Sequence, residues 1–99
     1  MVVATERTLT VLNPTGRARY NDAPLADRRE TLDGAVVGLL DNVKANASYF
    51  LDRVEERLRQ DFQIRGFVRR VKPTASKAVP DDQFRDLARV DALVTAFGD

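Results

Sequence analysis

The chain contains continuous runs of apolar residues and, between them, a stretch in which apolar residues recur with the spacing of a helix. Residues 35–40 (AVVGLL) form an uninterrupted apolar run, typical of a strand buried on both faces of a parallel sheet. Apolar residues then recur every three to four positions, which predicts a helix over residues 47–61. Residues 64–71 and 91–97 predict two more strands. Between them, Pro80 and the two aspartates that follow predict the start of a second helix.

The N-terminal third has no such periodicity. Residues 8–12 (TLTVL) are short, apolar and β-branched, and the turn sequence Asn13-Pro14-Thr15-Gly16 follows them, so we expect a strand there. Residues 13–33 carry prolines and many charges, which predicts a long arm of the kind that often binds a partner. We therefore expect a strand and extended arm over residues 1–34 and a βαβαβ unit over residues 35–99, within one domain.

This alternation predicts an α/β fold, half of a three-layer Rossmann-like architecture, with about four mostly parallel strands and two main helices. Right-handed crossovers would put strand 35–40 in the middle, between strands 64–71 and 92–97. Ligands of open α/β sheets bind at the carboxyl ends of the strands, where the winding direction reverses. The predicted site therefore lies between the loop 41–46 and the segment that begins at Gly98.

Composition narrows the function further. Sixteen basic and fifteen acidic residues leave a net charge of +1, which argues against a nucleic-acid or membrane surface. No run approaches the ~20 apolar residues of a membrane span, and there is no secretory signal, so we expect a cytoplasmic protein. Cysteine and histidine are both absent, which removes thiolate chemistry and the commonest base and metal ligand. We assign no catalytic residue, metal or cofactor to the chain.

Polar residues gather where the predicted site lies. After a buried strand, backbone N–H groups at a helix start favour an anion such as a phosphate or carboxylate. We expect Asn46 to cap the helix with its side-chain carbonyl. The candidate binding residues for an unknown small-molecule substrate are Asp41, Asn42, Lys44, Asn46, Lys72 and Ser76.

Two alternatives to an anion-binding site stay open for the same residues. The loop at residues 41–46 is also compatible with an ordinary capped turn, and Lys72 and Ser76 are also compatible with a solvated loop. A carboxylate pair of Asp41 and Asp99 for Mg²⁺ or phosphotransfer is less well supported. A phosphoacceptor domain would need an acidic pair after its first strand and a lysine on a fifth strand, and neither is present.

Several short motifs in order resemble the UGSC-motif family, from about residue 9 to residue 99. They include Leu12-Asn13-Pro14-Thr15-Gly16, Pro24-Leu25-Ala26, Leu32-Asp33-Gly34, Val37-Gly38-Leu39-Leu40-Asp41-Asn42, Lys72-Pro73, Ala75-Ser76-Lys77 and Pro80-Asp81. Val43 and Ala45 depart from the glycine and proline expected there. The resemblance implies that Gly98 and Asp99 position a following motif of cysteine or selenocysteine, then Gly-Ser-Cys. It also implies a redox or reductive activity without fixing the substrate.

Two hypotheses of different classes follow. In the first, the chain is the scaffold of a thiol- or selenol-dependent oxidoreductase, and its reading frame ends at an in-frame UGA that encodes selenocysteine. A UAA or UAG codon after codon 99, or no Gly-Ser-Cys codons beyond it, would contradict this. In the second, the chain is a non-enzymatic interaction module whose arm and sheet edge dock a partner, such as a second copy in a homo-oligomer. A molten or aggregated chain would favour the first hypothesis, and a cooperative dimer the second.

Overall fold

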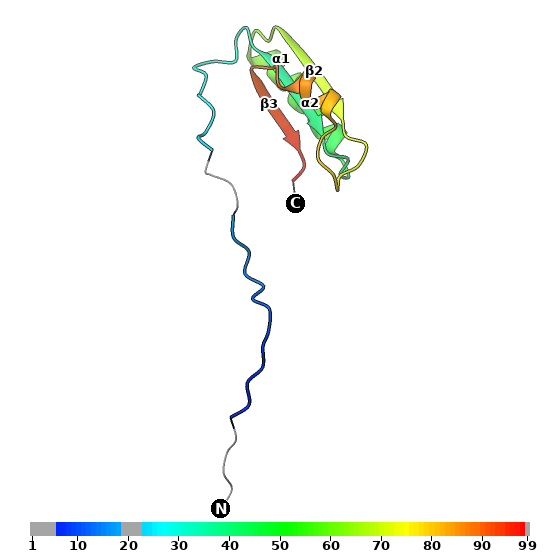
Figure 1. Ribbon diagram of the computed structural model, residues 1–99. Coiled ribbons are helices and arrows are strands. Elements are labelled where there is room, and N and C mark those ends of the chain that lie inside the picture. Colours follow the sequence, from blue (N-terminus) through cyan, green and yellow to red (C-terminus); the bar gives the residue numbers. More distant parts are fainter. Residues whose placement is uncertain (1–5, 19–22, 99) are drawn as a thin grey trace, which may run out of the picture.

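The fold is a small parallel sheet with a helix on each face, preceded by an extended arm (Figure 1). The computed structural model describes residues 6–18 and 23–98. Its elements are strand β1 (Val36–Asp41), helix α1 (Ala47–Asp61), strand β2 (Gly66–Val71), helix α2 (Asp81–Leu87) and strand β3 (Ala92–Ala96). The α/β class, the helix over 47–61 and the second helix after Pro80 are confirmed.

The three strands are ordered β2-β1-β3, and both pairings are parallel. This confirms the predicted position of the first apolar strand between the other two. Val36 lies opposite Gly66 on one side, and Val37 lies opposite Ala92 on the other. The carboxyl ends of all three strands therefore lie together at one end of the sheet.

The expectation of about four strands is wrong, because residues 8–12 are in no strand. Leu9, Val11 and Leu12 are 86%, 73% and 94% exposed. Figure 1 shows this segment extending away from the sheet, and the Cα positions span 84 × 30 × 26 Å. A β-branched run becomes a strand only when a neighbouring strand accepts its backbone hydrogen bonds, and none of the described strands lies beside it.

The core lies mostly between the sheet and α1. Val37 and Leu39 are buried against Leu51 and Ala47 of that helix, because alternate residues of β1 point to the same face. Gly38 points to the opposite face. A Cβ atom there would lie 3.0–3.1 Å from Leu93, Leu87 and Val90, so the absence of a side chain lets the region of α2 pack closely on the central strand.

The amino end of the sheet is held by one aspartate. The Val36 N–H donates to Asp91 Oδ2 at 2.8 Å, and the Asp91 N–H donates to the Val36 carbonyl at 2.8 Å. Asp91 also pairs with Arg29 at 3.6 Å. The arm therefore leaves the fold beside the start of β3.

Candidate functional site

Hydrogen bonds join the carboxyl ends of all three strands. The Asn42 side-chain N–H donates to the Phe97 carbonyl at 2.8 Å, just after β3. The Lys72 ammonium, just after β2, donates to Asn42 Oδ1 at 2.6 Å and reaches the Ala75 carbonyl at 3.4 Å. Asn42 is thus the centre of a cluster that spans the sheet, and both its amide groups are used. The structure brings Asn42 and Lys72 together from loops 30 residues apart.

Asp41 is 5% exposed and supports the loop rather than facing solvent. Its Oδ1 accepts the Val43 N–H at 2.7 Å, and its carbonyl accepts the Lys72 N–H at 3.0 Å. Val43 has φ 62°, a left-handed conformation that a β-branched residue rarely adopts. The aspartate therefore holds a tight turn that leads from β1 to α1.

The predicted side-chain cap at Asn46 is wrong. Asn46 has φ 66° and makes no side-chain hydrogen bond to the helix, whereas a capping residue normally has an extended backbone. Its carbonyl accepts the Phe50 N–H at 3.0 Å, the first bond of α1. Asparagine suits this position because it tolerates the left-handed region. The Ala47 N–H donates to the Lys44 carbonyl at 3.1 Å, and the Asn46 side chain offers no acceptor to the next N–H groups of the first turn, those of Ser48 and Tyr49.

The other predicted residues are less closely joined to the cluster. Ser76 is exposed, and its hydroxyl lies 3.1 Å from the Thr74 hydroxyl. Lys44 is half-buried in the loop between β1 and α1. Gly98 is exposed, and Asp99 lies outside the described residues.

Sequence reasoning missed three participants. The Phe97 and Ala75 carbonyls are main-chain groups, which no residue type reveals. Phe50 packs against Phe97 with ring centroids 5.0 Å apart and ring planes tilted by 50°, and it stays 44% exposed. An apolar wall therefore stands beside the polar cluster. The signal that could have found it was a phenylalanine in the first turn of α1, next to the loop.

One ion pair with a shifted pKa lies at the opposite end of α1 from this cluster. At the far end of α1, a hydrogen bond from Arg57 to Asp61 and their attraction raise the pKa of Arg57 above its usual value. Within residues 6–18 and 23–98, no group of three or more acidic side chains is arranged to hold a metal ion. In the same residues, no helix is long and apolar enough to cross a membrane.

Comparison with known proteins adds the family. A family model described as the UGSC family matches residues 10–99. The chain belongs to the UGSC family. The matched region contains every strand and helix of the described fold, so the Asn42–Lys72 cluster lies within the part of the chain that UGSC proteins share. No curated protein and no solved structure matches the chain.

Proposed function

We propose that this UGSC-family domain binds a small anion, a carboxylate or phosphate, at the carboxyl ends of its strands. The observation that carries the proposal is the Lys72 ammonium, which Asn42 holds at the carboxyl ends of the strands, where the loop that leads to the start of α1 also begins. An ammonium and free backbone N–H groups are complementary to a small anion, and the helix dipole adds to the attraction. Lys44 contributes a second positive charge from the loop between β1 and α1.

The surroundings indicate an anion with an apolar part. The packed rings of Phe50 and Phe97 lie beside the cluster because Asn42 bonds directly to the Phe97 carbonyl. A ligand whose charged group meets Lys72 would therefore bring its next atoms against an aromatic surface. This favours small organic acids over inorganic phosphate.

The test is an NMR titration of the 99-residue chain with acetate, a longer aliphatic carboxylate and phosphate at constant ionic strength. We expect saturable shifts at the Ser48, Tyr49 and Lys72 amides. Lys72→Gln should weaken binding by about fivefold or more, which corresponds to roughly 1 kcal/mol. Lys77→Gln, an exposed lysine of the same loop, is the matched control. Equal weakening by both variants, or shifts that never saturate, would refute the site.

The redox part of the proposal rests on the family. The resemblance implies that UGSC proteins carry a thiol or selenol motif after the Gly-Asp pair, and these 99 residues contain no cysteine. We propose that the fold serves as the scaffold and the ligand-binding loops for that chemistry. The codons after Asp99 test this part separately, because Gly-Ser-Cys codons are required there.

A docking role is the second candidate, and one observation favours it. Three large apolar side chains within residues 9–12 are at least 73% exposed, on the part of the arm that Figure 1 shows extending away from the strands. Contiguous exposed apolar residues commonly mark an interaction site.

A further inference from the structure

The two outer edges of the sheet, formed by β2 and β3, differ in how their outward backbone groups are covered. An edge strand presents unpaired N–H and C=O groups, which attract another strand unless they are covered. The Lys72 N–H donates to the Asp41 carbonyl of β1 and therefore points inward. Because backbone groups of successive strand residues point to opposite sides, those of Arg69 and Val71 point outward from β2. At the other edge, the Ala96 carbonyl accepts the Asn42 N–H, so the backbone groups of Leu93 and Thr95 point outward from β3.

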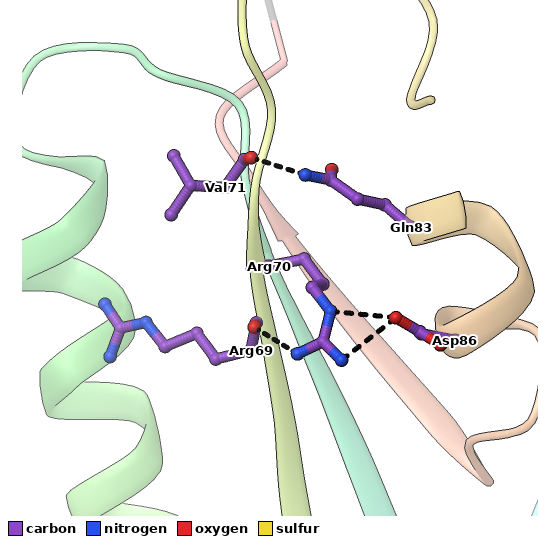
Figure 2. Close-up of polar contacts among 5 residues, drawn as sticks. All are labelled: Arg69, Arg70, Val71, Gln83 and Asp86. Atoms are coloured by element: carbon purple, nitrogen blue, oxygen red, sulfur yellow. Dashed lines mark hydrogen bonds and ion pairs between the residues drawn. The ribbon is translucent and has the colours of Figure 1, made fainter. Parts of the chain in front are cut away.

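Side chains cover the outward carbonyls of β2. Figure 2 shows the Arg70 guanidinium donating to the Arg69 carbonyl at 2.8 Å and Gln83 of α2 donating to the Val71 carbonyl at 2.8 Å. Arg70 is held there by Asp86 of α2, at 3.0 and 3.1 Å. An added strand would have to break these bonds and desolvate the arginine. These bonds therefore obstruct further pairing along the C-terminal half of this edge.

The edge of β3 has no such cover. In the part of the chain that the structure describes, no hydrogen bond reaches the outward backbone groups of Leu93 and Thr95. Leu93 is also 49% exposed, on the same sheet face as Gly38. This edge thus combines open hydrogen-bonding groups with an apolar side chain that a neighbour could bury.

The chain itself contains a segment of matching chemistry. Residues 8–12 have strand-forming composition and no partner strand, and Leu9 and Val11 would share one face of a strand. The arm leaves the fold beside the start of β3, through the Arg29–Asp91 pair, and then extends away from its own sheet. Pro14 and Pro24 favour this extended path.

We propose that residues 8–12 of one copy pair with the outer edge of β3 in a second copy, and that two copies exchange these strands reciprocally. Leu9 and Val11 then cover the exposed side of Leu93, and the outward groups of β3 gain backbone partners. Once one arm is bound, the second exchange takes place within the complex at a high effective concentration, so a closed dimer forms. This inference rests on the docking role proposed above and specifies its segment, edge and partner.

Cysteine cross-linking tests the pairing directly, because the natural chain has no cysteine. Chains carrying Thr10→Cys are mixed with chains carrying Thr95→Cys and treated with a bismaleimide whose spacer can pass around the strand pair, because Thr10 lies on the opposite strand face from Leu9 and Val11. We expect cross-linked heterodimers. The matched control replaces the second chain with Val71→Cys, which places an exposed cysteine on the covered β2 edge and should give little product. Each single variant is first checked for an unchanged circular dichroism spectrum.

Analytical ultracentrifugation of the full chain provides the second measurement. We expect a monomer–dimer equilibrium whose dissociation constant rises by at least about tenfold in the Leu9→Asp/Val11→Asp variant, because charges replace the apolar contacts. Leu25→Asp, an arm residue that is 89% exposed and outside the segment, should leave the constant unchanged. All three positions are exposed on the arm, so the fold of the domain is preserved.

Three results would overturn the inference. Preferential cross-linking to Val71→Cys would keep the docking role but refute the choice of edge. Cross-linking within single Thr10→Cys/Thr95→Cys monomers would show that the arm folds back on its own sheet. A chain that stays monomeric at every concentration, with no cross-linked product, would remove both the exchange and the docking role.

Discussion

The left-handed turn at Val43 predicts that glycine is more stable than alanine there. A φ of 62° brings the Cβ atom of an L-residue too close to the backbone, which costs roughly 1–2 kcal/mol. Glycine has no such cost, but it loses about 0.5–1 kcal/mol relative to alanine through its freedom in the unfolded chain. Both substitutions remove the half-exposed valine side chain, so that loss cancels when Val43→Gly and Val43→Ala are compared. We expect Val43→Gly to be the more stable by about 0.5–1 kcal/mol.

The assay is urea unfolding followed by circular dichroism, with the slope m compared between variants to confirm that only stability has changed. Val54 in the middle of α1 provides the reversed control, since its backbone is helical. There, Val54→Gly should be less stable than Val54→Ala by about 1 kcal/mol. If alanine is also the more stable residue at position 43, the turn does not carry the strain that its φ implies. A stabilising glycine would fit the glycine that the family resemblance leads us to expect at this position.

Three further substitutions test other parts of the fold. Gly38→Ala should lower the free energy of unfolding by about 1–3 kcal/mol because its Cβ would lie 3.0 Å from a leucine side chain, whereas Gly66→Ala, with nothing within 4 Å, should change it little in the same urea titration. Asn42→Ala should cost about 1–3 kcal/mol because it leaves a carbonyl and an ammonium without their partner, and thermal unfolding at neutral pH measures the loss. Arg70→Ala should uncover the β2 edge and cause concentration-dependent association seen by ultracentrifugation, and unchanged behaviour would mean that Gln83 alone closes that edge.

The elements marked by a clear apolar pattern and packed into the sheet domain were predictable from the sequence. Helix α1 has its expected bounds, because its apolar stripe repeats with helical period and the loop residues before it interrupt the pattern. The three strands of the βαβαβ unit begin and end within two residues of the apolar runs that predicted them. The prediction of a strand at residues 8–12 was wrong, because a strand needs a neighbouring strand and composition does not show whether one is present.

The site was predictable only as far as topology reaches. Parallel strands end at a common edge, and this places Lys72 near Asn42 without any knowledge of side-chain geometry. The capping role of Asn46 failed because the turn that precedes it imposes a left-handed backbone. The Phe97 carbonyl could not be foreseen, since every residue has one and only the fold decides which carbonyl faces the loop.

The central position of β1 has a consequence during synthesis. Among the described elements this strand is the first to leave the ribosome, yet its partners follow about 30 and 55 residues later, as the Lys72–Asn42 and Asn42–Phe97 bonds indicate. At translation rates of roughly 5–20 residues per second, the sequence VVGLL stays unpaired on both sides for a period on the order of seconds. During that interval it is an apolar strand without a sheet, the kind of segment that chaperones bind and that misassembles when crowded. The most buried strand of the finished domain is thus the most vulnerable segment of the nascent one.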